Sequence, residues 1–143
     1  MTSNYKFIDH TADIAVEVSG TTYEELFLAA MEGWKNSICD EVKSKTAAEN
    51  RPVDLEEDSV EELLVSFLQE FNYLFDSKKI YPLSVSNIKI TESNNTFQLN
   101  SIIPFCKISD TDIIKNEIKA VTFHQLDIKT EDGLYKTIVV FDI

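Results

Sequence analysis

The fold is decided by the stretch SVEELLVSFLQEFNYLF, residues 59–75. Its apolar side chains recur every three to four positions, which is the period of one face of an α-helix. Ser59 and Glu62 have the spacing of a capping box and predict where this helix begins. An apolar face this wide predicts a helix that lies flat on a β-sheet. The face consists of Val60, Leu63, Leu64, Phe67, Leu68, Phe71, Leu74 and Phe75.

A shorter helix is predicted nearer the N-terminus. Thr22 and Glu25 again have capping-box spacing, and Gly20 ends the strand that precedes them. The apolar stripe of this second helix is typical of a helix that faces the core, rather than of a ligand-binding segment. The stripe consists of Phe27, Ala30, Met31, Trp34 and Ile38.

Most of the remaining chain has the pattern of β-strands, and Asn94-Asn95 and Asp132-Gly133 are typical hairpin turns. A change of phase near Ser86-Asn87 predicts a bulge. The whole pattern predicts an α+β fold: a single domain, residues 1–143, with two main helices packed on one face of a mainly antiparallel sheet. Strands are predicted over residues 5–8, 12–18, 51–55 at a sheet edge, 83–90, 97–105, 118–128 and 135–142, with irregular connections over 43–50 and 110–117.

The charge balance of the chain is strongly acidic, with 13 Lys and Arg against 25 Asp and Glu and a formal net charge of −12. This charge opposes independent binding to nucleic acid or to an anionic membrane, and it suits a cation, a basic protein surface or solubility alone. Cys39 and Cys106 lack the spacing of a zinc or redox pair, so free thiols in a reducing compartment are expected. No apolar segment has the length of a membrane span, and a cytoplasmic protein is expected.

Acidic oxygen donors lie at both ends of the sequence. Asp13 stands near the N-terminus, and Asp142 and Ile143 follow the apolar run 138–141. That run is typical of a buried strand, and the two ends of a domain often lie near each other. If these ends converge, their carboxylates repel one another unless a hard cation or a basic group neutralises them. The alternative is that the two ends lie apart and are solvated.

Lys119 and His124 lie on the strand predicted over residues 118–128. Alternation places His124 on the same strand face as Ile118, and it places Lys119 on the opposite face. Lys119 borders the acidic chain ends if this strand neighbours the last one; otherwise it is a solvated strand lysine. His124 fits a metal ligand, an acid–base group or a half-buried, hydrogen-bonded side chain.

Motifs of the common enzyme classes are absent from the sequence. There is no GxSxG, HExxH, P-loop or GxGxxG pattern, and three glycines are too few for a glycine-rich phosphate cradle. The residues leave two classes open: a binding protein with an oxygen-rich cation site, or a small metal-dependent hydrolase that uses Asp13, Asp142 and His10. A general chaperone is less favoured, because nothing in the sequence indicates an exposed apolar groove.

Several segments occur in an order that resembles the archease family over essentially the whole chain. They are His10-Thr11-Ala12-Asp13, Leu63-Leu64-Val65 followed by Tyr73-Leu74-Phe75-Asp76, the run IKAVTFH at residues 118–124, and the final Asp142-Ile143. The resemblance implies a small α+β protein that activates a GTP-dependent RNA-splicing ligase of the RtcB type and is not itself an enzyme. Such a ligase acts in tRNA splicing and RNA repair, and the family promotes its guanylylation and multiple turnover. The expected partner is therefore a protein, with no stable direct binding to nucleic acid and none to a membrane.

The resemblance also implies the site residues. A divalent cation, calcium by association with the family, is expected on Asp13, Asp142 and the main-chain or terminal oxygens of Ile143. Lys119 matches a basic position that the family needs for ligase activation. Apart from the resemblance, the residues themselves make His10 and His124 candidates for positions around the ion rather than among its direct ligands.

Overall fold

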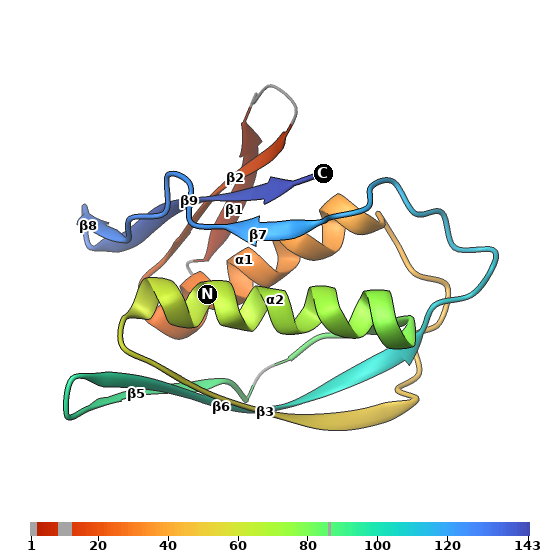
Figure 1. Cartoon of the computed structure of the whole chain (residues 1–143), viewed down its shortest axis with the longest axis horizontal. Helices are drawn as coiled ribbons and strands as arrows, with labels where there is room; N and C mark the ends of the chain where they lie inside the picture. The colour runs from red at the N-terminus through yellow and green to blue at the C-terminus, as the bar shows by residue number, and fades with distance from the viewer. Residues whose placement is uncertain (1–2, 9–12, 86) are drawn as a thin grey trace.

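In the computed structural model, two helices lie between two β-sheets (Figure 1). The structure describes residues 3–8, 13–85 and 87–143. The predicted α+β fold, with two main helices and antiparallel strands, is confirmed; the strands are divided between a five-stranded and a four-stranded sheet. The predictions that concern His10 and Ser86 lie outside the described residues. The helices are α1 (Tyr23–Ile38) and α2 (Val60–Lys78).

The five-stranded sheet contains the strands nearest both ends of the chain. Its strands follow the order β1 (Asn4–Ile8), β2 (Asp13–Gly20), β9 (Leu134–Asp142) and β7 (Ala120–Thr122), and β8 (Lys129–Glu131) also pairs with β9. β2 and β9 pair along their whole length, from Asp13 opposite Asp142 to Gly20 opposite Tyr135. Helix α1 packs against β1, β2 and β9. The central pairing therefore joins two segments from opposite ends of the sequence.

The four-stranded sheet is built on β6 (Thr96–Lys107). β3 (Glu49–Glu57) pairs with one side of β6, and β4 (Ile80–Pro82) and β5 (Lys89–Ser93) pair with the other. Pro52 lies in β3 at the edge of this sheet, as predicted, where its missing N–H removes no ladder hydrogen bond.

Both helices begin at the predicted capping residues. The Thr22 Oγ1 accepts a hydrogen bond from the backbone N–H of Glu25, and the Ser59 Oγ accepts one from that of Glu62, both at 3.1 Å. Each bond satisfies one of the N–H groups that a helix start leaves without an intrahelical partner. In the described part of the chain, neither helix combines the length and the apolar character that crossing a membrane requires.

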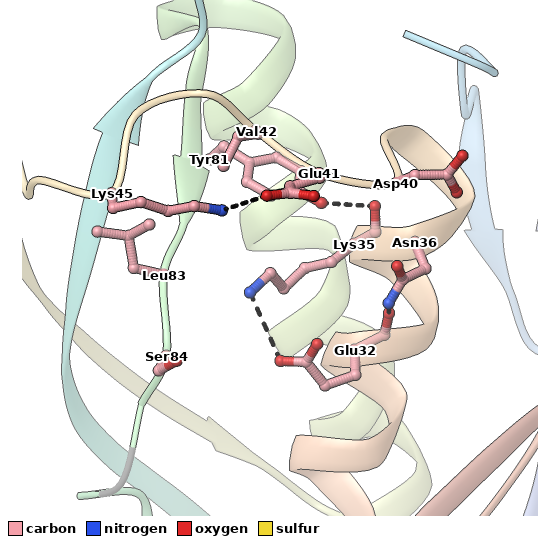
Figure 2. A pocket seen from close by; sticks show the side chains of 10 residues that line it. All are labelled: Glu32, Lys35, Asn36, Asp40, Glu41, Val42, Lys45, Tyr81, Leu83 and Ser84. Carbon is pink, nitrogen blue, oxygen red and sulfur yellow. Dashed lines mark hydrogen bonds and ion pairs between the residues drawn. The ribbon is translucent and has the colours of Figure 1, made fainter. Parts of the chain in front are cut away.

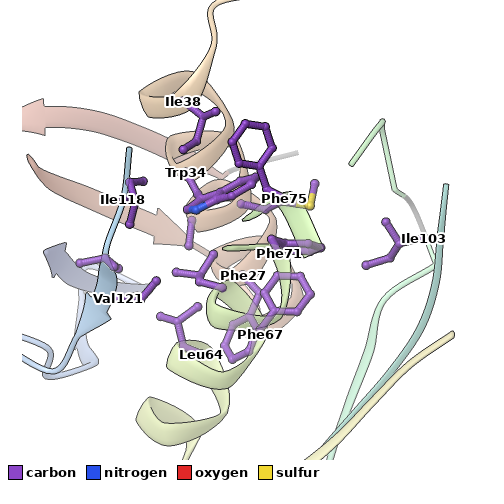
Figure 3. Close-up of a cluster of buried hydrophobic side chains, with 14 of the residues drawn as sticks. Phe27, Trp34, Ile38, Leu64, Phe67, Phe71, Phe75, Ile103, Ile118 and Val121 are labelled. Atoms are coloured by element: carbon purple, nitrogen blue, oxygen red, sulfur yellow. The ribbon is translucent and has the colours of Figure 1, made fainter. Parts of the chain in front are cut away.

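Aromatic side chains of the two helices fill the centre of the core (Figure 3). Trp34 of α1 packs against Phe71 of α2 with 5.9 Å between ring centroids, and Phe27 packs against Phe67 at 5.6 Å. Val121 of β7 belongs to the same buried cluster. Helix α2 packs against β3, β4 and β6 of one sheet and against β7 of the other, so its wide apolar face is covered from both sides.

The two predicted hairpin turns are confirmed. Asn94 and Asn95 connect β5 to β6 with φ values of 52° and 64°, and Asp132 and Gly133 connect β8 to β9 with φ values of 53° and 77°. Positive φ at both central residues is the geometry of a type I′ turn, which asparagine, aspartate and glycine favour.

The strand predicted over residues 118–128 is wrong in its length, because β7 comprises only residues 120–122. The chain turns directly afterwards: the N–H of Leu126 donates to the carbonyl of Phe123 at 3.0 Å, and Gln125 has a positive φ of 63°. Ile118 precedes the strand and is buried in the core, so it does not share a strand face with the residues that follow.

The connection between β6 and β7, residues 108–119, is irregular, as predicted for its central part. Hydrogen bonds nevertheless connect it to the loop that follows α1. The Asp112 carboxylate accepts hydrogen bonds from the backbone N–H groups of Ser109 and Lys43, each at 2.8 Å. These bonds, led by that from Ser109, hold the pKa of Asp112 below its usual value.

Cys39 and Cys106 are both free and buried, which confirms the prediction of unpaired thiols. Burial raises the pKa of the Cys106 thiol, so the reactive thiolate is disfavoured there. Both side chains therefore contribute to the structure as small apolar groups.

Candidate functional site

Two carboxylates meet at one corner of the five-stranded sheet. β2 and β9 lie side by side in Figure 1. Asp13 is the first residue of β2 and Asp142 is the last residue of β9, and the strand register places them directly opposite each other. Directly opposed residues of an antiparallel pair point to the same face, with Cβ atoms roughly 4.5–5.5 Å apart. The predicted convergence of the two ends is therefore confirmed.

This corner concentrates negative charge in a partly exposed position. Asp13 is half-buried and Asp142 is exposed. Ile143 follows Asp142 with 38% of its surface exposed, so its main-chain oxygens lie next in sequence to the two carboxylates. Because like charges directly opposite each other destabilise a strand pair, a cation or a basic group at this corner would stabilise it.

The backbone of Lys119 is bound to the same corner. β7 pairs with the side of β9 away from β2, and its first residue, Ala120, lies opposite Asp142. The N–H of Lys119 donates to the carbonyl of Asp142 at 2.8 Å. The backbone of Lys119 therefore lies beside the acidic ends, and its side chain is exposed.

A shallow hollow of about 340 Å³ opens beside Asp13. One wall comes from β1 and β2, and the other comes from the end of α1 and the connection before β7. The Asn116 side chain donates to the carbonyl of Ser37 at 2.8 Å, which holds the second wall together. No local motif predicts this hollow, because it forms only when three distant segments pack. It is lined by Phe7, Ile8, Asp13, Ile14, Ser37, Lys115 and Asn116.

The two predicted histidines are not both found at this corner. His10 lies outside the described residues. His124 is exposed and follows the end of β7 that runs away from Asp142, since Thr122 already lies opposite Val140. The N–H of His124 donates to Thr122 Oγ1 at 3.2 Å. The antiparallel course of β7 therefore carries His124 away from the position expected for it around the ion.

The donor atoms at this corner suit a hard cation. Side-chain carboxylates and main-chain oxygens are the ligands that calcium prefers, and calcium takes about six to eight of them. Over residues 3–8, 13–85 and 87–143, no group of three or more His, Cys, Asp or Glu side chains is arranged to hold a metal ion. Beyond Asp13 and Asp142, further ligands would come from the main chain, from water or from a partner. The residues fit an exposed calcium-type site of this kind better than a zinc site of nitrogen and sulfur donors.

A larger pocket lies at the C-terminal end of α1, with a volume of about 410 Å³ (Figure 2). It contains none of the predicted site residues. Its two lysines pair with two of its acidic side chains, Lys35 with Glu32 and Lys45 with Glu41, each at 3.5 Å. The third acidic side chain, Asp40, pairs with Lys115 outside the pocket at 2.6 Å. A pocket whose charges neutralise each other attracts a charged ligand less than two adjacent carboxylates do, so its size alone does not make it the site.

One buried polar residue near the corner was not predicted. Asn72 interrupts the apolar face of α2 and is only 7% exposed. Its Nδ2 donates to the carbonyl of Ile118 at 2.8 Å, and its Oδ1 accepts from Trp34 Nε1 at 3.2 Å. Its only signal in the sequence is an amide at a position that the helical period assigns to the core.

Known proteins resemble this chain over almost its whole length. The model of the Archease protein family matches residues 5–143. A "Protein archease" of Methanosarcina barkeri is 36% identical over 141 residues, covering 97% of this chain and 95% of the relative. A "Protein archease" of Methanothermobacter thermautotrophicus is 31% identical over 139 residues, covering 97% and 98%.

Solved structures with similar sequences have the same fold. The solution structure of protein 1598 from Methanobacterium thermoautotrophicum has a TM-score of 0.83 and 30% identity, covering 98% of this chain and 99% of that one. The crystal structure of an archease from Thermotoga maritima, described as a possible chaperone, has a TM-score of 0.57 and 29% identity, covering 96% of each chain. The chain therefore belongs to the archease family.

Proposed function

We propose that this protein is a non-catalytic activator of a GTP-dependent RNA-splicing ligase of the RtcB type. It promotes guanylylation of the ligase and thereby its multiple turnover in tRNA splicing and RNA repair. A divalent cation, calcium, binds at Asp13, Asp142 and the main-chain oxygens of Ile143, and Lys119 acts on the partner. The observation that carries the proposal is the register of β2 and β9, which sets two carboxylates opposite each other beside the backbone of Lys119.

Exposed apolar side chains near the acidic corner support a protein partner. Phe7 is 48% exposed and lines the hollow beside Asp13, while Ile113 and Ile114 are 78% and 41% exposed and lead to Lys115, which lines the same hollow. Exposed apolar side chains bordered by polar and charged groups are typical of surfaces that bind other proteins. The net charge of −12 favours a basic partner, such as an enzyme that binds RNA.

The geometry suggests how the chain contributes to ligase activation. Asp13 and Asp142 hold the cation at an exposed corner, where groups of the partner can reach it. A bound divalent ion supplies positive charge that stabilises the phosphates of GTP as they react. The exposed side chain of Lys119 adds a second positive group beside this corner, suited to a phosphate or carboxylate of the partner complex. The reacting groups themselves belong to the ligase.

The experiment that tests this function mixes the purified protein with its cognate ligase, GTP and manganese. We expect substoichiometric protein to accelerate guanylylation of the ligase and to convert ligation of RNA ends from single to multiple turnover. Alone, the protein should neither join RNA nor hydrolyse GTP, nor act in a phosphatase and esterase screen. An unchanged guanylylation rate with stoichiometric, folded protein would overturn the proposal. Hydrolysis that disappears in Asp13→Ala would instead support a metal-dependent hydrolase.

A further inference from the structure

One peptide group next to the site forms a hydrogen bond through its carbonyl and another through its N–H. The carbonyl of Ile118 and the N–H of Lys119 belong to the same planar peptide unit. The carbonyl accepts from Asn72 Nδ2 at 2.8 Å, and the N–H donates to the carbonyl of Asp142 at 2.8 Å. Because a trans peptide points its C=O and N–H in opposite directions, these two bonds together fix the orientation of the whole plane.

Asn72, which binds this peptide group from the core side, is itself held in one orientation. Asn72 lies in the middle of α2 and is 7% exposed. Its Oδ1 accepts from Trp34 Nε1 at 3.2 Å, which fixes the direction of the amide and so aims Nδ2 at Ile118. Figure 3 shows Trp34 and Ile118 in one cluster of buried side chains. A buried amide is stable only when its polar atoms have hydrogen-bond partners, and both Oδ1 and Nδ2 of Asn72 have one.

A second amide of α2 holds the other end of the same segment. Gln69 Nε2 donates to the carbonyl of Val121 at 3.3 Å. Gln69 and Asn72 are three residues apart and therefore lie on the same side of the helix. The segment from Ile118 to Val121, which includes Lys119, is thus attached to α2 at two carbonyl groups.

We propose that Asn72 is a positioning residue for the acidic corner: it fixes the peptide plane between Ile118 and Lys119, and through it the direction of Lys119 relative to Asp142. Gln69 assists from the surface. The consequence for activation rests on the proposed function of Lys119, whereas the effect on the peptide plane does not.

The test compares three variants. Asn72→Leu keeps a similar volume but removes the bond to Ile118. Trp34→Phe removes the N–H that donates to Asn72 Oδ1 and so loosens the orientation of the amide, but it keeps both Nδ2 and the Ile118 carbonyl that it binds. Gln69→Ala changes an exposed residue and should fold even if Asn72→Leu does not. Folding is checked by circular dichroism and urea unfolding.

The first readout is hydrogen exchange at the backbone N–H of Lys119, measured by NMR without any ligase. Losing one supporting hydrogen bond should speed exchange by roughly two- to tenfold in Asn72→Leu, and by a smaller factor in Gln69→Ala. Trp34→Phe should have less effect than Asn72→Leu. Unchanged exchange at Lys119 in folded Asn72→Leu and in Gln69→Ala would overturn the proposal.

The second readout is ligase activation in a double-mutant cycle. Asn72→Leu should reduce activation in the wild-type background and have no further effect in a Lys119→Ala background, because it acts through Lys119. Fully additive losses would contradict positioning and indicate a general loss of structure. If Lys119→Ala activates as well as the wild type while exchange at Lys119 still depends on Asn72, the proposed role of Lys119 fails and the structural inference stands.

Discussion

Replacing Asp142 by Asn should change the stability of this protein in opposite directions with and without calcium. The substitution keeps the size of the side chain and leaves the backbone bond from Lys119 in place, but it removes one of two charges that the strand register sets opposite each other. At roughly 5 Å the repulsion between two carboxylates amounts to about 0.8 kcal/mol in water and about 3 kcal/mol at a protein surface. Because Asp142 is exposed, the lower figure applies. In the presence of a chelator, Asp142→Asn should therefore be more stable than the wild type by about 0.5–1 kcal/mol.

Calcium should reverse this order. A ligand at 100 times its dissociation constant stabilises the folded state by about 2.7 kcal/mol, provided that it does not bind the unfolded chain. The wild type should gain this stabilisation, and Asp142→Asn should lose most of it together with a charged ligand. Urea unfolding of both proteins, with a chelator and with calcium, measures all four free energies.

Asp132→Asn provides a matched control for this prediction. It makes the same change in the turn at the other end of β9, where a type I′ geometry accepts either residue. The control should respond to calcium as the wild type does. Equal calcium stabilisation of the wild type and Asp142→Asn, or a loss of stability of Asp142→Asn in the chelator, would refute the reasoning.

Two further perturbations test other parts of the structure. Tyr81→Phe should cost about 1–2 kcal/mol in urea unfolding, because the buried hydroxyl donates to the carbonyl of Lys35 at 2.6 Å; an unchanged free energy would show that this bond contributes nothing net. The pKa of Asp112 is lowered in the folded state by its two backbone N–H partners, so its stabilisation is complete above the usual value of 3.8 and is lost as the pH falls through the lower folded value. Asp112→Asn should therefore flatten the decline of stability below about pH 4, and an unaltered acid transition would contradict this assignment.

Local sequence signals predicted the helices and turns well. Ser59 and Glu62 marked the start of α2, because a capping box is satisfied within four residues whatever the rest of the chain does. Asn94-Asn95 marked a hairpin for the same reason, since a type I′ turn depends on its own two central residues.

Non-local features were harder to predict. The predicted length of β7 was wrong because Ile118 is buried and bound to Asn72 of α2, a tertiary contact that alternation does not encode. The positive φ of Gln125 at the turn that follows β7 likewise has no signal in the alternation. The division of the strands between two sheets likewise follows from how both sides of α2 are covered. The corner itself could be anticipated from Asp13 and Asp142, but only the pairing of β2 with β9 shows that they meet.

The guanylylation rate of the cognate ligase, measured with variants of the acidic corner, tests the central claim most directly. Asp13→Ala, Asp142→Ala and Lys119→Ala should each fold and each reduce the activation, because surface substitutions of this kind seldom cost much stability. Asp132→Asn, at the far end of β9, should activate as the wild type does. Activation by all three corner variants equal to that of the wild type would contradict the account.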